Sequence, residues 1–313
     1  MIETVVSVGY PVDETLHIKK NRLTPEAGLS GGEKRISIVT GTHGDELEGQ
    51  YVCYELQRRI REHPDCLRGI VDVYPALNPL GIDSITRGIP AFDLDMNRIF
   101  PGAENGSMPE YIAARIVDDL SGSDMVIDIH ASNIFLKEIP QVRINTLSRD
   151  VLVPYAKKLN IDYIWVHAAA TVLESTLAYS LNSIGTPTLV VEMGVGMRLT
   201  AGYGRQLAEG ILNLMAGQGM WSGPVQPPRR PIVSRDEVAF LNADAAGVFI
   251  PCVPHNGYVE KGQKLAVIAD PMTGEDRQVV TAPEDGLLFT LREYPVVYPG
   301  SLLARILTGG QKK

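Results

Sequence analysis

The amino-acid sequence predicts an α/β protein with a mixed, largely parallel central sheet and a smaller all-β domain at its C-terminal end. Apolar runs such as Ile36–Val39 and Thr188–Val191 indicate buried strands. Segments with helical periodicity separate such runs, and this alternation is typical of parallel sheets covered by helices. A proline-rich stretch at 223–233, which is expected to be a linker, then divides residues 1–222 from a glycine-punctuated segment at 234–313.

The elements of the first domain can be placed from their patterns. Val52, Leu56 and Ile60 recur every fourth residue, as one face of a helix does. Two stretches lack a regular pattern: His17–Gly32 is interpreted as a polar connection, and Asn78–Gly106 as a long functional or disordered loop. Strands are expected at Thr4–Val8, Ile36–Val39, Ile70–Tyr74, Met125–Ile129, Val142–Ile144, Tyr163–Val166 and Thr188–Val191, and helices at Glu46–Glu62, Pro109–Leu120, Arg149–Leu159 and Tyr203–Met215.

Composition excludes several classes of partner. The 313 residues carry a formal net charge of -8, which argues against nucleic-acid binding. An acidic protein that binds an anionic substrate must gather its arginines locally. The three cysteines, Cys53, Cys66 and Cys252, are odd in number and unpaired in spacing, so a reducing compartment is expected. With no secretory pattern and no apolar run of ~18 residues, we expect a cytoplasmic protein without membrane association.

The C-terminal segment consists of two similar halves. Ala246–Ile250 with Val259–Leu265, and Asp285–Phe289 with Val296–Leu303, repeat short strands with glycines at matching places. This pattern resembles the barrel-sandwich fold of lipoyl and biotinyl carriers, which present a modifiable lysine on the turn between halves. Here that turn, Asp270–Asp276, contains no lysine. A structural role, or a cover over the active site, is therefore expected instead of a carrier function.

Three polar residues follow predicted strands and suggest a metal site. His43 and Glu46 lie in the Gly41–Glu46 turn after the Ile36–Val39 strand, and His130 follows Met125–Ile129. A lone histidine at a strand end is usually a structural polar residue. A histidine, a glutamate and a second histidine at the carboxyl ends of parallel strands, however, match a catalytic zinc site with one open position.

Further charged residues could serve chemistry around such a metal. In the long loop, Asn97 and Arg98 can together bind one carboxylate, and Arg87 can polarise a carbonyl and hold its developing oxyanion. Loop residues of these types are often merely solvated. Glu192 ends the Thr188–Val191 strand, where it is either a partner in a salt bridge or a general base.

The combined motifs resemble the succinylglutamate desuccinylase/aspartoacylase family of zinc-dependent deacylases, which are relatives of the zinc carboxypeptidases. The resemblance rests on Gly41–Glu46, Asp95–Gly102, Asp128–His130 and Val191–Gly194, and it extends over nearly the whole chain, including the C-terminal domain. It implies a zinc-carboxypeptidase-like fold and a soluble deacylase that hydrolyses the amide bond of a small N-acyl amino acid or related N-acyl amine.

The resemblance also implies the role of each residue. His43, Glu46 and His130 would bind one Zn²⁺ per chain. Glu192 would be the general base that takes a proton from the attacking water and passes it to the leaving amine, and Arg87 would polarise the carbonyl. Asn97 and Arg98 would bind the α-carboxylate of the substrate. The candidates for binding a second carboxylate are Arg143, Arg198 and Tyr294.

Two alternatives share this site. A zinc carboxypeptidase acting on short peptides would use the same residues but would need an open cleft. A non-catalytic metal-binding relative would lack a ligand or the base, and neither is missing from the sequence. A homodimer is expected only because it is the commonest oligomeric state of soluble proteins.

Overall fold

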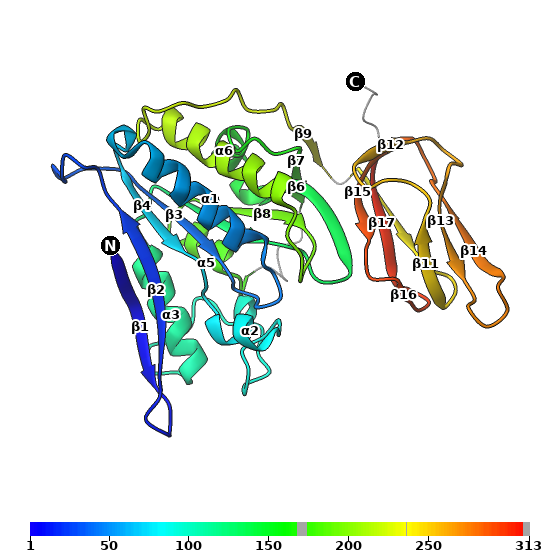
Figure 1. Ribbon diagram of the computed structural model, residues 1–313, viewed down its shortest axis with the longest axis horizontal. Coiled ribbons are helices and arrows are strands. Elements are labelled where there is room, and N and C mark those ends of the chain that lie inside the picture. The colour runs from blue at the N-terminus through cyan, green and yellow to red at the C-terminus, as the bar shows by residue number, and fades with distance from the viewer. Residues whose placement is uncertain (168–173, 236, 309–313) are drawn as a thin grey trace.

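The computed structural model describes residues 1–167, 174–235 and 237–308, and shows an α/β body joined to a β-rich C-terminal domain (Figure 1). In these residues a 13-stranded mixed sheet runs through both parts, in the order β1-β2-β4-β3-β5-β8-β6-β15-β17-β10, with β7, β9 and β12 branching from it. A second sheet has the order β14-β13-β11-β16. The predicted class, a mixed and partly parallel sheet with helices and a smaller β domain, is confirmed.

Four parallel strands form the centre of the body: β4 (Ile70–Tyr74), β3 (Arg35–Thr40), β5 (Met125–His130) and β8 (Thr188–Gly194). Side chains point alternately to the two faces of each buried strand, so both faces of this sheet are apolar, and helices cover both of them. The larger core joins the sheet to α1 (Glu48–Glu62), α4 (Arg149–Ala156) and α6 (Ala201–Gly217). The opposite core joins it to α3 (Met108–Leu120) and α5 (Leu177–Ser183).

The stretch expected as a polar connection is partly a strand. Strand β2 (Thr15–Leu23) pairs with the edge strand β1 (Ile2–Gly9) and with β4. The prediction failed because the inward-facing positions of β2 include Lys20, whose ammonium group donates to Asp119 at 2.8 Å. A charged residue at an inward-facing position interrupts the alternation of apolar and polar residues by which a strand is recognised. The partner that neutralises the charge is distant in the sequence, so it gives no local signal.

The long loop is ordered around two short helical turns. Helix α2 (Pro79–Ser84) begins after Asn78, whose side chain accepts from the backbone N–H of Gly81. The 3₁₀ turn η2 (Met96–Arg98) begins after Asp95, whose carboxylate accepts from the Asn97 N–H. These caps satisfy backbone donors locally, which lets an aperiodic segment keep one conformation beside the sheet.

The sheet continues beyond β8 through antiparallel pairing. Strand β6 (Leu136–Asn145) pairs with β8, then β7 (Tyr163–His167) adds in parallel to β6, and β9 (Ile232–Arg235) in parallel to β7. Strand β9 thus begins inside the stretch expected as a linker. Two other short 3₁₀ turns lie at Pro64–Cys66 and Thr146–Ser148, the first of them directly after α1.

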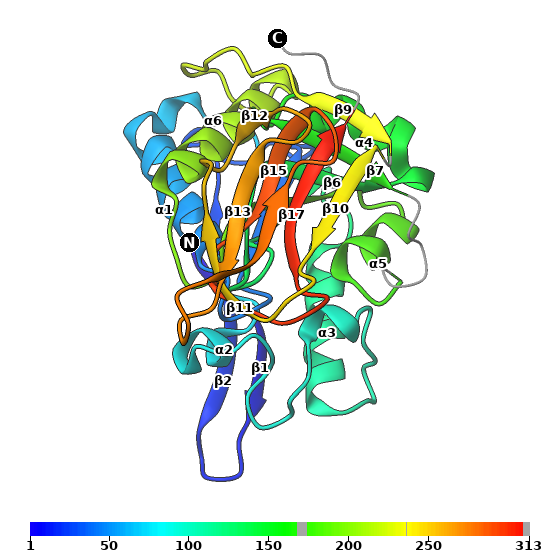
Figure 2. The ribbon, with the colours of Figure 1, turned by 90° about the vertical axis from the view of Figure 1, so that its right-hand side faces the viewer.

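The C-terminal domain packs its two sheets around a shared apolar core (Figure 2). Its strands are β10 (Val238–Asn242), β11 (Gly247–Pro251), β12 (Gly257–Val259), β13 (Lys264–Ala269), β14 (Asp276–Thr281), β15 (Gly286–Arg292), β16 (Val296–Val297) and β17 (Leu302–Thr308). The lysine-free turn joins β13 to β14. The domain is continuous with the central sheet, because β15 pairs with β6. Among the described residues, no helix is long and apolar enough to cross a membrane.

Candidate active site

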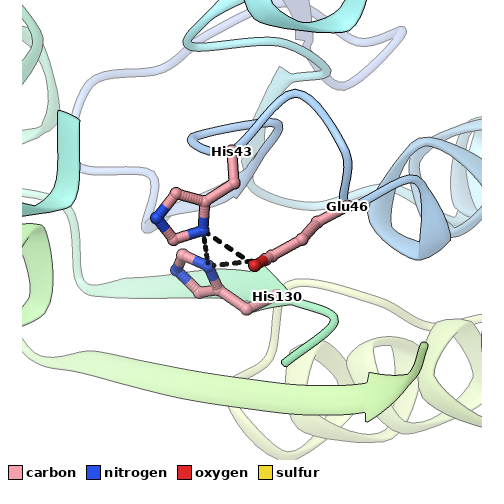
Figure 3. Close-up of side chains that lie close together, drawn as sticks. All are labelled: His43, Glu46 and His130. Atoms are coloured by element: carbon pink, nitrogen blue, oxygen red, sulfur yellow. Dashed lines mark hydrogen bonds and ion pairs between the residues drawn. The ribbon is translucent and has the colours of Figure 1, made fainter. Parts of the chain in front are cut away.

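Three side chains converge at the carboxyl ends of β3 and β5 (Figure 3). His43 Nδ1 lies 2.9 Å from Glu46 Oε1, and His130 Nδ1 lies 3.1 Å from Glu46 Oε2. The two Nδ1 atoms are 3.3 Å apart. The side chains of His43 and Glu46 are 3% exposed, and that of His130 is 4% exposed. The structure therefore brings together the three residues expected as metal ligands.

Glycines allow the first two of these residues to reach the site. Gly41, directly after β3, has a φ of 68°, a left-handed conformation that favours glycine. Gly44 lies so close to the α2 segment that an added Cβ would be 1.9 Å from the Gly81 carbonyl carbon. The turn between β3 and α1 is consequently tight, and it aims His43 and Glu46 at the end of β5.

The donor set fits a metal ion. Two imidazole nitrogens and one carboxylate oxygen lie within 4.8 Å of one another, and no second such group occurs in the part of the chain that the structure describes. Two nitrogens and an oxygen from three side chains are a common ligand set of catalytic zinc, which keeps a further position open. Two imidazoles with facing nitrogens beside a carboxylate are costly to bury without a cation between them.

A second layer of carboxylates supports the histidines. Asp95 Oδ1 lies 3.0 Å from His43 Nε2, and Asp128 Oδ2 lies 3.1 Å from His130 Nε2. At His130, a proton on Nε2 would face Asp128 and leave Nδ1 free to bind a metal. At His43, Nε2 also lies 3.0 Å from Arg87 Nη2, which can only donate, so Asp95 and Arg87 compete for this nitrogen. Burial lowers the pKa of His130, but Asp128 and Glu46 together raise that pKa well above its ordinary value. Sequence reasoning quoted both aspartates in motifs but assigned them no role.

Arg87, Asn97 and Arg98 line the same cavity as this cluster. Arg87 Nη1 donates to Glu46 Oε1 at 2.8 Å. Asn97 Oδ1 accepts from the Leu177 N–H at 3.0 Å, which ties the loop to α5. Arg98 donates to the Asn97 carbonyl oxygen, and no carboxylate of the described chain forms an ion pair with it. Arg98 therefore offers an uncompensated positive charge.

Glu192 lies at the end of β8, opposite His130 in the strand register. Its Oε2 accepts from the Ser132 N–H at 2.8 Å, and its Oε1 accepts from Arg143 Nη1 at 3.0 Å. Burial raises the pKa of the Glu192 carboxyl, and the charge of Arg143 opposes that rise. A carboxyl whose pKa is moved toward neutrality is suited to both accept and return a proton.

A cavity of about 620 Å³ connects these groups. It follows the face of β8 that carries Thr188, Val190 and Glu192, and Tyr179 and Asn182 of α5 stand over it. Eight predicted site residues line it: His43, Glu46, Arg87, Asn97, Arg98, His130, Arg143 and Glu192. Sequence reasoning missed other lining residues, including Asp128, Ser132, Asn133, His167, Tyr179 and Arg305.

The other two predicted residues are not part of the cavity wall. Arg198 is exposed, and its Nη1 donates to the neighbouring Met197 carbonyl oxygen at 3.0 Å. Tyr294 is 45% exposed and packs edge-on against Phe135, with 5.7 Å between ring centroids. Neither residue lines the cavity, and their roles as substrate contacts stay predictions.

The fold and the site define an α/β protein with an enzyme-like cavity built around a candidate metal centre at the ends of parallel strands. Residues 33–217 match the family model described as Succinylglutamate desuccinylase/Aspartoacylase catalytic domain. The chain belongs to this family, and the resemblance inferred from its motifs is confirmed. The expectation of a deacylase, a hydrolase of amide bonds, is confirmed by the same matches.

Named relatives agree with this assignment. The chain is 25% identical over 296 residues to an N-alpha-acetyl-L-2,4-diaminobutyric acid deacetylase of Halomonas elongata, covering 91% of this chain and 85% of the relative. It is 28% identical over 176 residues to an N-acyl-aromatic-L-amino acid amidohydrolase (carboxylate-forming) A of Danio rerio, covering 51% and 52% of the two chains.

Solved structures share the whole fold. The product-bound ectoine utilization protein EutE (DoeB) of Ruegeria pomeroyi superposes with a TM-score of 0.79 at 19% identity, covering 97% of this chain and 94% of that one. A succinylglutamate desuccinylase/aspartoacylase of Rhodobacter sphaeroides gives a TM-score of 0.80 at 21% identity, covering 99% and 96%. These likenesses extend through the C-terminal domain, beyond the matched catalytic segment.

Proposed function

We propose that this protein is a zinc-dependent amidohydrolase that cleaves a small N-acyl amino acid, or a related N-acyl amine, into a carboxylate and a free amine. The observation that carries the proposal is the position of Glu192 beside the His43–Glu46–His130 cluster in one cavity that Arg98 also lines. The relatives named as a deacetylase and an amidohydrolase support this substrate class. The volume of about 620 Å³ suits a small molecule.

Each residue has a role in this proposal. Zn²⁺, one per chain, would be held by His43, Glu46 and His130, and would polarise the acyl carbonyl and acidify a water molecule. Glu192 takes the proton of the attacking water and returns it to the departing nitrogen. Arg87, whose Nη1 lies 2.8 Å from Glu46 Oε1, stabilises the negative charge that develops on the carbonyl oxygen.

The positive charge of Arg98 gives the substrate its orientation. A substrate carboxylate can accept from the Arg98 guanidinium and from the Nδ2 amide group of Asn97, whose Oδ1 accepts from the Leu177 N–H. Arg143, which lines the cavity but is engaged by two glutamates, and Arg198 and Tyr294, which do not line it, complete the set of proposed substrate contacts.

The division of the chain is part of the proposal. Residues 1–222 would form the catalytic domain, 223–233 the linker, and 234–313 a domain that closes one side of the site. Arg305 of β17 lines the cavity, which supports such a role. A cytoplasmic location and a homodimer are proposed on general grounds, the free cysteines favouring a reducing compartment.

Metal analysis and a substrate panel test the proposal. The purified chain should contain about one zinc per chain, lose hydrolysis of its best N-acetyl, N-succinyl or other N-acyl amino acid on chelation, and regain it with Zn²⁺. Dipeptides and unacylated amides serve as the comparison set. Release of amine from dipeptides alone would identify a carboxypeptidase, and no release from any member by the zinc-loaded protein would identify a non-catalytic relative.

A further inference from the structure

A second cluster of buried charges lies behind the reacting groups. Glu138 on β6 is completely buried, and its Oε1 accepts from Arg305 Nη1 at 2.8 Å and from Ser132 Oγ at 3.0 Å. Arg143 Nη2 donates to both of its oxygens, at 2.9 and 2.7 Å, and the Gln141 side chain donates to Oε2. Buried carboxylates are costly unless paired in this way, so Glu138 acts as the centre of a fixed network.

This network supplies the hydrogen-bond donors to both carboxylate oxygens of Glu192. Arg143, which binds Glu138 through Nη2, binds Glu192 Oε1 through Nη1 at 3.0 Å. Ser132, whose hydroxyl binds Glu138, donates its backbone N–H to Glu192 Oε2 at 2.8 Å. The two donors that orient Glu192 are therefore both anchored on one buried carboxylate.

Arg305 brings the C-terminal domain into this network. It lies on β17, and it is 167 positions from Glu138 in the sequence. Its guanidinium carbon lies 5.8 Å from the ring of Trp165 on β7 and 5.7 Å from that of Phe240 on β10. Arg143 lies over the same Trp165 ring at 5.8 Å. These two neighbouring rings, whose centroids are 6.4 Å apart, help to hold the Arg305 charge at Glu138.

The backbone places these side chains accurately. Strands β15 and β6 pair with Thr290 opposite Glu138, and β15 pairs with β17 with Thr290 opposite Arg305. Arg305 thus reaches Glu138 across one completely buried threonine of a continuous sheet. Groups supported by adjacent strands of one sheet keep their geometry better than groups supported by loops.

We propose that Arg305 is a positioning residue, which acts through Glu138 to keep Arg143 divided between Glu138 and Glu192 and so holds Glu192 in its working orientation. In the intact network, Arg143 forms ion pairs with both glutamates, and Arg305 forms a further one with Glu138. Without Arg305, Glu138 keeps only Arg143 as a cationic partner, and Arg143 shifts toward this fully buried charge. Glu192 then loses the donor to Oε1 and can turn away from the substrate.

The inference rests on the proposed hydrolase function, and kinetics of the zinc-loaded full chain test it. Arg305→Gln should lower kcat by about 10- to 100-fold, because small displacements of a catalytic group are costly, with KM changed less than about threefold. Arg305→Lys should restore part of kcat. Arg277→Gln is the matched control, because it breaks the ion pair of Arg277 on β14 with Asp270, outside the cavity wall, and should keep wild-type kinetics.

A crystal structure of Arg305→Gln supplies a readout that needs no activity. It should show the Arg143–Glu192 contact lengthened beyond hydrogen-bonding distance and the Arg143–Glu138 contact kept. If the wild-type chain hydrolyses nothing, the proposed function fails, and this structure still decides whether Arg305 positions Glu192.

Several results would overturn the positioning role. A kcat within twofold of the wild type, an unchanged Glu192 in the variant structure, or a rise confined to KM, which would mark Arg305 as a direct substrate contact, each contradicts it. If Arg305→Gln fails to fold, Arg305→Met carries the test, since it keeps an extended side chain against the aromatic rings but removes the charge. A several-fold loss of kcat at constant KM supports the inference there, and unchanged kinetics oppose it.

Discussion

Replacement of Glu192 by glutamine should leave the metal in place and remove most turnover. Glu192 is outside the His43–Glu46–His130 set, so about one zinc per chain should remain. The loss of a general base is worth about 10²- to 10⁴-fold in kcat, or about 3–5 kcal/mol of activation free energy. Glutamine can accept from only one of the two donors at this position, so the other, Arg143 or the Ser132 N–H, faces an NH₂ group.

That mismatch makes a structural control necessary. A donor left facing a donor costs about 1–3 kcal/mol of folding free energy, which a thermal melt of the variant would reveal. The assay is steady-state amine release by the zinc-loaded variant, with zinc content measured on the same sample. A folded, zinc-loaded Glu192→Gln enzyme that keeps more than about a tenth of the wild-type kcat would show that another group is the base.

Three further predictions concern support and packing. Asp128→Asn, which weakens the contact that fixes the ring of His130, should lower metal affinity about 10- to 100-fold in a competition with a chelator. On α6, Gly210→Ala should lower the melting temperature, because its Cβ would lie 1.8 Å from a backbone carbonyl oxygen. Gly202→Ala, with no atom within 4 Å of its Cβ, should raise the free energy of unfolding by up to about 1 kcal/mol, and the melting temperature with it. Burial raises the pKa of Glu138, but its arginine contacts outweigh burial and hold that pKa below the ordinary value of 4.5, so its stabilisation is present above pH 4.5 and is lost as the pH falls through the lowered pKa. In chemical denaturation between pH 6 and 3, Glu138→Gln should therefore show a shallower decline of stability than the wild type, and an equally steep decline would contradict this sign.

The parts of the fold that sequence alone predicted are those with local signals. Strands β3, β5 and β8 are largely apolar runs, and α1 shows its buried face through Val52 and Leu56. Strand β2 was missed because Lys20 occupies an inward position and is neutralised by Asp119, which lies on α3. The continuity of the sheet through β6 and β15 has no local signal, because strand pairing between distant segments depends on tertiary context.

The same distinction applies to the site. His43, Glu46, His130 and Glu192 were predictable because each lies at or just after the carboxyl end of a strand, and parallel strands end at one edge of a sheet. Arg143 was a candidate from the sequence, but Glu138 and Arg305 were not predicted, because charged residues in a strand are usually exposed. The expectation that arginines gather locally in an acidic protein agrees with the cavity, which is lined by Arg87, Arg98, Arg143 and Arg305.

In three places a carboxylate supports a residue of the site. His43 is backed by Asp95, His130 by Asp128, and Glu192, through Arg143, by Glu138. In each case a carboxylate outside the proposed reacting set supports the orientation of a group inside it, which would reduce the reorientation needed when a substrate binds. The third carboxylate differs because its network includes Arg305 on β17, a strand of the C-terminal domain. Completion of the active site therefore depends on correct docking of both domains, although the expected ligands and base all lie in the first.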